Sequence, residues 1–254
     1  MDAPSISVIV PVYNEEHEIG TIVPALAQIL DARGGSWEVL VVDNASVDGT
    51  AARLEPFLSD GRVRYVRNEV NRGKGYSVRR GMLEATGDLR LMCDADCTAS
   101  LPSLPALEAL VGEAEVVAGS RNTPEATVTR YQPLHRRMAS LGFILLCRAV
   151  MREPLPDIFC GFKLFTAEAA QEVFDRAQID GWAFDAEALA LARALGYRVA
   201  PCGIAWRNRP DSRLSIPHVI VPVLRELIAT RRRLAKVVAR PASAAPVAAP
   251  DGSH

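Results

Sequence analysis

Apolar runs that stop abruptly at polar clusters recur through the first half of the chain. The runs at 6–11, 37–43 and 89–93 are almost continuously hydrophobic and short. This pattern is typical of strands that are buried on both faces of a sheet. Shorter strands are expected at 63–66 and 115–119.

Between these strands, apolar residues recur at helical spacing. We expect helices there, with Pro24 kinking or interrupting the first and Ser100 capping the last. The expected helices are 15–30, 50–58, 76–85 and 101–111. Regular alternation of strand and helix predicts an α/β fold with a Rossmann-like, mostly parallel sheet and helices on both faces.

The second half of the chain is less regular. A compact glycine-centred segment at 157–165 and a strand at 198–206 are expected among four helices, the third of which ends at Gly196. These helices are 134–151, 167–177, 185–195 and 216–238. We divide the chain into one α/β domain over 1–215 with halves 1–120 and 121–215, a basic amphipathic helix over 216–239 and a disordered tail over 240–254.

Three polar clusters begin where expected strands end: "PVYNEE", "DNASVDGT" and "DADCTAS". In open α/β sheets, ligands bind at the carboxyl edge of the strands. The third cluster places Asp94 and Asp96 one residue apart, which in an extended strand puts both carboxylates on one side. Such a pair repels unless a cation lies beside it, and Mg²⁺ or Mn²⁺ is the natural candidate. The alternative is a solvated loop in which the two aspartates terminate the strand and bind nothing.

Bulk properties exclude several classes of protein. The formal net charge is −1, so no basic field favours nucleic acid. The five cysteines contain no CxxC pair, which fits a reducing cytoplasm better than a disulfide framework. No apolar stretch reaches the roughly 20 residues that span a bilayer, and the first residues lack the basic region of a signal peptide. We expect a cytoplasmic protein, with peripheral contact at the inner membrane face left open.

Other phosphate and nucleophile motifs do not match. Lys74 is followed by Gly75 rather than Ser or Thr, so no P-loop is present, and no GxGxxG or GxSxG sequence occurs. The histidines at 17, 135, 218 and 254 form no metal or triad pattern.

The motifs "SVIVPVYNEE", "VVDNASVDGT", "NRGKGYSVRRGMLEATGD", "DAD", "GSR" and "DIFCGFKLFT…GWAFDAE" follow one another in the order found in family 2 glycosyltransferases. Over roughly residues 5–215 the chain resembles the polyprenyl-phosphate branch, which contains dolichyl-phosphate glucosyltransferases and mannose synthases. The resemblance implies a GT-A fold, a nucleotide-sugar half at 1–120, an acceptor half at 121–215 and an inverting, metal-dependent transfer. It also implies a nucleotide-diphosphate sugar as donor and Mg²⁺ or Mn²⁺ as cofactor.

The resemblance also assigns roles by matching position. Asp96, with Asp94, would hold the metal, and Asp94 would also meet the ribose or sugar. The nucleotide-sugar pocket would comprise Pro11, Tyr13, Glu15, Asp43, Arg72, Lys74, Asp94 and Arg213. The acceptor phosphate would meet Arg121 and one of Arg136 and Arg137. The segments 160–163 and 182–187 would flank the donor sugar, and Arg207, Ser212 and Arg213 match a basic loop.

Three departures from the family pattern stand out. Asn44 replaces the second acid of the common Asp-Asp-Gly-Ser sequence, Cys97 replaces the glutamine that follows DAD in mannose synthases, and the transmembrane helices of many relatives are missing. The last departure keeps a soluble small-molecule hydroxyl acceptor open beside a polyprenyl phosphate. A nucleotide-sugar binding protein without turnover is a further alternative. A nucleotidyltransferase would need a glycine-rich basic loop after the first strand, which is not found.

The acceptor determines whether a general base is needed. A phosphate monoester is mostly ionised near neutrality, whereas an alcohol needs a base. Asp185 is the candidate base, and the alternative is that it caps the helix beginning at Ala186. Two alternatives also remain for the helix over 216–238, which are contact with an anionic membrane and packing against the domain. Either would suit its arginines and its apolar residues Ile220, Leu224, Leu227 and Ile228.

Overall fold

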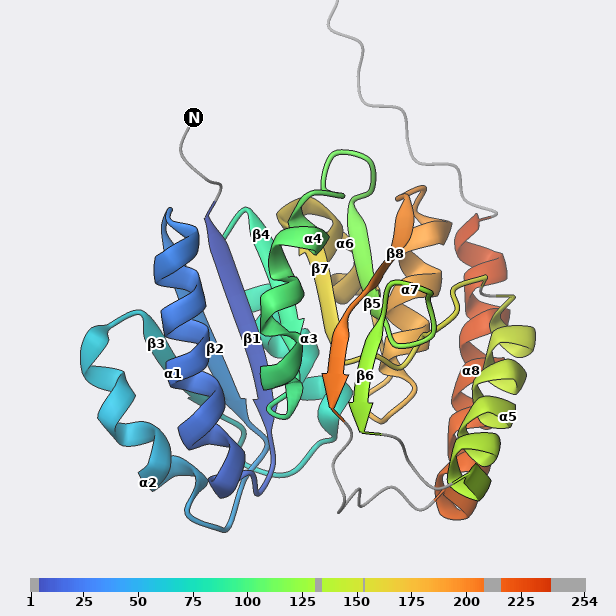
Figure 1. Ribbon diagram of the computed structural model, residues 1–254. Coiled ribbons are helices and arrows are strands. Elements are labelled where there is room, and N and C mark those ends of the chain that lie inside the picture. The colour runs from blue at the N-terminus through green and yellow to red at the C-terminus, as the bar shows by residue number, and fades with distance from the viewer. Residues whose placement is uncertain (1–4, 131–133, 153, 208–215, 239–254) are drawn as a thin grey trace, which may run out of the picture.

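A computed structural model describes residues 5–130, 134–152, 154–207 and 216–238 (Figure 1). Strands and helices alternate as the hydrophobic pattern predicts. In chain order the elements are β1 (Ile6–Val12), α1 (Glu16–Arg33), β2 (Trp37–Asp43), α2 (Thr50–Leu54), the 3₁₀ helix η1 (Glu55–Asp60), β3 (Val63–Arg67), α3 (Lys74–Glu84), β4 (Leu89–Cys93), the 3₁₀ helix η2 (Cys97–Ser103), α4 (Leu104–Glu108), β5 (Val116–Ser120), β6 (Thr127–Arg130), α5 (Leu134–Met151), β7 (Phe162–Thr166), α6 (Ala167–Arg176), α7 (Phe184–Ala194), β8 (Val199–Gly203), β9 (Ala205–Arg207) and α8 (Ile216–Val238).

The main sheet has seven strands in the order β3-β2-β1-β4-β7-β5-β8. β1 runs parallel to β2 and β4, β2 is parallel to β3, and β5 is parallel to β8. Only β7 runs against its neighbours β4 and β5. The expectation of a mostly parallel α/β sheet is therefore confirmed, and the antiparallel β7 comes from the segment that the sequence marked only as compact and glycine-centred.

Helices cover both faces of this sheet and bury two apolar layers. On one face, alternate β1 residues such as Val8 and Val10 pack with α1, η2 and α4. On the other, Ile9 packs with α3, α6 and α7. Because neighbouring residues of a strand point to opposite faces, a continuously apolar strand serves both layers.

α8 lies beside α5 and α7 at the far end of the sheet from α2 (Figure 1). Val223 and Leu227 are buried in this contact, and Arg233 of α8 forms an ion pair with the fully buried Glu187 of α7. Leu227, one of the apolar residues on which the two alternatives rested, thus packs against the domain. Ile228 was expected on the same apolar face, but its side chain is 44% exposed.

Local structure differs from the expectations at several points. The helix expected at 101–111 begins as η2, and Ser100 lies inside it, where its hydroxyl donates to the Ala205 carbonyl (2.7 Å) instead of capping. The expected strand 198–206 divides at Ile204 into β8 and β9, which pair with different sheets. α1 continues through Pro24 without interruption. Gly196 ends α7 with a φ of 92°, as expected for a residue that follows a helix.

Candidate active site at the carboxyl edge of the sheet

The carboxyl ends of β1, β2 and β4 meet at one edge, because the three strands are parallel neighbours. Val12, the last residue of β1, lies opposite Asp43, the last residue of β2. The polar clusters that follow these strands are therefore brought together, as the sequence predicted. Pro11 is buried within β1, whereas Tyr13, just beyond the strand, is 42% exposed at this edge.

The first two clusters interlock through backbone and side-chain hydrogen bonds. Asn14 and Ala45 adopt left-handed conformations, with φ of 55° and 63°. The Asn14 amide donates to the Ser46 hydroxyl (2.9 Å), and the Glu15 amide donates to the Thr50 hydroxyl (3.0 Å). Two non-glycine residues in this sparsely populated region at one edge are typical of a functional site.

Asp43 is fully buried and organises the rim of the site. Its Oδ1 accepts from the Ser46 amide (2.8 Å), and its Oδ2 accepts from the Tyr65 hydroxyl (2.5 Å) and from Arg67 Nη1 (2.6 Å). Burial and the hydrogen bond to the carboxylate raise the pKa of Tyr65. Both oxygens of Asp43 thus serve the protein's own structure.

Asn44 holds the turn that carries Arg72 and Lys74, a role that the sequence did not reveal. Its Nδ2 donates to Asn71 Oδ1 (2.7 Å), while its Oδ1 accepts from the Arg72 amide (3.0 Å). An aspartate has no hydrogen to donate, so the amide at this position is matched to Asn71. The guanidinium of Arg72 lies over the ring of Tyr76, 4.0 Å from its centroid.

Two glycines bring this turn against the segment before α7. A Cβ at Gly73 would lie 2.2 Å from the Asp180 carbonyl oxygen, and one at Gly75 would lie 2.3 Å from the Ile179 carbonyl oxygen. Gly73 also has a φ of 100°, which favours glycine. This close contact places Lys74 beside the third polar cluster, residues 94–100.

Lys74 and Asp94 form the charged centre of the site. Lys74 Nζ lies 2.6 Å from Asp94 Oδ2, and the side chains are only 20% and 21% exposed. Burial disfavours the ammonium, but the carboxylates of Asp94, Asp185 and Asp96 outweigh it, so the pKa of Lys74 is raised. Asp94 Oδ1 is buried without a hydrogen-bond partner in the part of the chain that the structure describes.

The DAD sequence forms a turn, not the extended strand that would place both carboxylates on one side. The Cys97 amide donates to the Asp94 carbonyl (2.9 Å), and Asp96 precedes η2. The two carboxylates therefore do not share one face of a strand. β4 ends at Cys93, and the chain must bend there to begin η2.

The carboxylates of Asp94 and Asp96 suit a hard divalent cation whose remaining ligands come from outside the protein. Among the described residues, no group of three or more His, Cys, Asp or Glu side chains could enclose a metal. An unpartnered buried oxygen on Asp94, with Asp96 two residues away, matches the one or two carboxylates that usually hold Mg²⁺ beside substrate phosphates. The residues present therefore fit the expected cofactor.

Asp185 is buried and paired with Lys163, a residue that the sequence analysis missed. The Lys163 ammonium donates to the Cys160 carbonyl (2.5 Å) and to Asp185 Oδ1, and the two residues are 1% and 5% exposed. Burial raises the pKa of Asp185 even though Lys163 and Lys74 oppose it. The capping alternative is wrong, because α7 begins at Phe184 and its N-cap is Ala183. The only signal for Lys163 was a lysine inside an apolar run.

Arg121 lies at the end of β5 and is bound by a buried carboxylate. Its Nε and Nη2 donate to Asp157 Oδ2 (2.7 Å) and Oδ1 (2.9 Å), and its amide also donates to Oδ2 (3.1 Å). Burial opposes the charge on Asp157, but Arg121 lowers its pKa, and Asp157 in turn raises the pKa of Arg121. The guanidinium also lies 5.1 Å from the Trp206 ring centroid.

A hollow of about 600 Å³ opens beside Arg121. Leu141 and Arg148 of α5 and Pro156 form its other side. Arg136 and Arg137 belong to α5, but their side chains are not among those that the structure describes. Ser212 and Arg213 lie outside the described residues, whereas Arg207 ends β9 with an exposed side chain.

The sheet order, the antiparallel β7 and the acidic carboxyl edge define a GT-A fold. The structure resembles glucosyl-3-phosphoglycerate synthase from Mycobacterium tuberculosis, with a TM-score of 0.66 and 21% identity over 95% of this chain and 83% of that one. The same synthase has been crystallised with Mn²⁺, UDP and phosphoglyceric acid; this form has a TM-score of 0.65 and 21% identity, and the match covers 95% of this chain and 81% of that one.

Residues 7–174 match the profile of glycosyl transferase family 2, and the chain belongs to this family. It is 31% identical to the Homo sapiens dolichyl-phosphate beta-glucosyltransferase over 231 residues, which cover 84% of this chain and 71% of that protein. The Dictyostelium discoideum protein of the same name is 28% identical over 242 residues, covering 90% and 74% of the two chains. No helix in the described ranges combines the length and the apolar character needed to cross a bilayer.

Proposed function

We propose that the protein transfers a hexose, most simply glucose, from a UDP-sugar to a polyprenyl phosphate, with inversion at the anomeric carbon. The observation that carries this proposal is the Lys74–Asp94 centre, with its unpartnered Asp94 oxygen, at the carboxyl edge of a family 2 sheet. Relatives named dolichyl-phosphate beta-glucosyltransferases support the acceptor, and a structural neighbour crystallised with UDP-glucose supports the donor.

Asp94 and Asp96 would hold a divalent cation, which supplies Lewis-acid stabilisation of the charge left on the diphosphate. Lys74 adds a preorganised positive charge at the same place, since its ammonium remains protonated. Tyr13 and the turn held by Asn44 would border the nucleotide. The buried Lys163–Asp185 pair would keep the first turn of α7 fixed beside Lys74.

The acceptor phosphate would enter the hollow beside Arg121. Arg121 is locked by Asp157 and Arg148 lies across the hollow, so two guanidinium groups border the space. A phosphate monoester is already ionised and needs positioning rather than deprotonation. This agrees with an Asp185 whose carboxylate is buried and occupied by Lys163, which suits positioning better than proton removal.

The test is transfer from UDP-glucose to a water-soluble short-chain polyprenyl phosphate, with Mn²⁺ or with a chelator. We expect metal-dependent transfer that falls about 100-fold or more in Asp94→Asn and Asp96→Asn. Asp175→Asn, an exposed aspartate on α6, is the matched control and should keep full activity. Undiminished transfer in the site variants under chelation would refute the proposal.

A panel of soluble alcohols separates the remaining alternatives. Transfer to an alcohol but not to the polyprenyl phosphate would assign a hydroxyl acceptor and require a base, and Asp185→Asn would then abolish turnover. Binding of UDP-glucose without turnover on any acceptor would identify a binding protein.

A further inference from the structure

α5 carries an exposed apolar ridge that no described element covers. The side chains of Met138, Leu141, Leu145 and Leu146 are 60%, 45%, 52% and 43% exposed. Their spacings of three, seven and eight residues place them on one helical face. The opposite face, with Ile144 among others, is buried against the domain. A contiguous exposed apolar surface of this kind marks a binding site.

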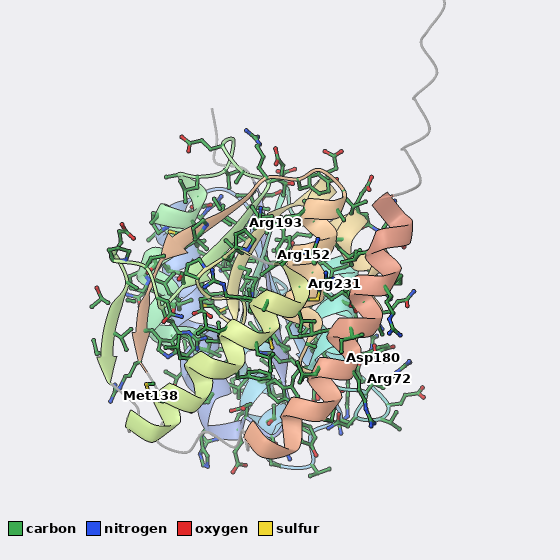
Figure 2. The ribbon with its side chains drawn as sticks, turned by 90° about the vertical axis from the view of Figure 1, so that its right-hand side faces the viewer. Arg72, Met138, Arg152, Asp180, Arg193 and Arg231 are labelled. Carbon is green, nitrogen blue, oxygen red and sulfur yellow. The ribbon has the colours of Figure 1, made fainter. Side chains whose placement is uncertain are left out.

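The surroundings of the ridge are basic. Residues 134–152 contain no aspartate or glutamate, and Arg148 and Arg152 lie at the end of the helix. α8, packed alongside, adds the exposed Arg225, Arg231 and Arg232. Figure 2 shows Arg152 and Arg231 close together near the carboxyl end of α5 and Met138 near its other end. A chain with a net charge of −1 thus gathers arginines around one apolar helix face.

The acidic residue of α8 does not neutralise this surface. Glu226 is turned toward the active-site side, where a Cβ at Gly181 would lie 3.1 Å from its Oε1. Burial and the nearby Asp180 raise its pKa. The described part of the surface formed by α5 and α8 is therefore apolar and cationic, and it complements an apolar, anionic partner.

We propose that this surface docks the protein on an anionic lipid bilayer, with α5 lying in the membrane interface. Its apolar side chains would enter the boundary between headgroups and acyl chains, and the arginines would contact anionic headgroups. A second copy of the chain is a poorer partner, because a symmetric contact would place these arginines against each other.

The docked orientation brings the acceptor hollow to the membrane. Leu141 and Arg148 belong to α5 and also line the hollow beside Arg121. A phosphate carried by a membrane lipid could then reach Arg121 while its chain remains in the bilayer. Docking itself is independent of the acceptor, whereas this use of the hollow rests on the proposed function.

Sedimentation with vesicles, in the absence of donor and acceptor, tests the docking. We expect the full chain to bind vesicles of equal parts phosphatidylcholine and phosphatidylglycerol at low salt and to bind pure phosphatidylcholine weakly. Leu145→Ser with Leu146→Ser should lower the partition coefficient by at least about ten-fold. Arg152→Gln with Arg231→Gln should lower the partition coefficient by about 30-fold, because each arginine near an anionic surface contributes about 1 kcal/mol.

A matched substitution on the rest of the surface serves as the control. Arg53 is exposed on α2, at the far end of the sheet from α8, so Arg53→Gln should leave vesicle binding unchanged. All variants should retain the wild-type melting temperature and transfer to the water-soluble acceptor.

Three results would overturn the docking proposal. They are absence of binding to anionic vesicles at low salt, equal loss of binding in the control variant, and a dimer in gel filtration that the α5 substitutions dissociate. Failure of transfer to the soluble acceptor would instead count against the proposed function and leave vesicle binding as it is.

Discussion

Gly161→Ala tests whether the position of the Asp94 carboxylate sets the activity. Gly161 precedes β7, and its carbonyl accepts the Asp94 amide (2.9 Å), so the two backbones are tied together. A Cβ at Gly161 would lie 1.9 Å from Asp94 Oδ2 and 2.1 Å from its Cγ. Gly161 is not among the glycines with positive φ, so alanine brings a clash without backbone strain.

The size of the effect follows from these distances. The Asp94 carboxylate must retreat by about 1.5 Å to bring the 1.9 Å separation up to the 3.4 Å of ordinary contact. That movement displaces the oxygen that lies 2.6 Å from Lys74 Nζ. Misplacement of a reacting group by about 1 Å can cost about 100-fold in rate, so we expect kcat/KM to fall by about 100-fold or more. Overpacking should cost about 1–3 kcal/mol of unfolding free energy.

Initial rates of transfer from UDP-glucose measure this effect, and thermal melting shows that the variant is folded. Gly20→Ala is the matched control, because no atom lies within 4 Å of a Cβ at Gly20, inside α1. That variant should keep full activity and gain about 0.5–1 kcal/mol of stability. Wild-type kcat/KM in Gly161→Ala would refute the assignment of Asp94 to the reacting centre.

Three further outcomes are expected. Asn44→Asp removes the hydrogen that binds Asn71, and calorimetry should show UDP binding weakened by about ten-fold; unchanged affinity would contradict this role. Arg198 lowers the pKa of Glu115 from 4.5 to about 2, so this contribution to stability is present above pH 4.5 and disappears as the pH falls toward 2. The melting-temperature difference between wild type and Glu115→Gln should therefore shrink from pH 7 to pH 3. A constant difference would contradict a stabilising contribution from the Glu115–Arg198 pair. Arg233→Ala leaves the buried carboxylate of Glu187 on α7 without its cation. Urea unfolding should show a free energy of unfolding lower by about 3 kcal/mol. Arg232→Ala, at the neighbouring exposed arginine, should change this free energy little.

Local patterns in the sequence were sufficient for much of the sheet. Continuous apolar runs predicted β1, β2 and β4 to within a residue of their ends, because a strand buried on both faces needs apolar side chains at every position. Parallel neighbours end at the same edge, so the clusters containing Tyr13, Asp43 and Asp94 could be expected to meet. The order of the motifs indicated the family, which the comparisons confirm.

The tertiary structure decided which charged groups pair. Lys163 reaches Asp185 from a strand that runs against its neighbours, and Arg121 is held by Asp157, 36 residues later in the chain. Neither pairing leaves a periodic signal in the sequence, because each depends on how distant elements pack.

Side-chain exposure on the last helices was decided in the same way. The hydrophobic pattern singled out α8 as the amphipathic surface helix, yet α8 buries Val223 and Leu227 while α5 leaves Leu145 and Leu146 exposed. Both helices carry enough apolar residues to pack or to face a membrane. Periodicity determines that a helix has an apolar face, but only the positions of its neighbours determine whether that face is covered.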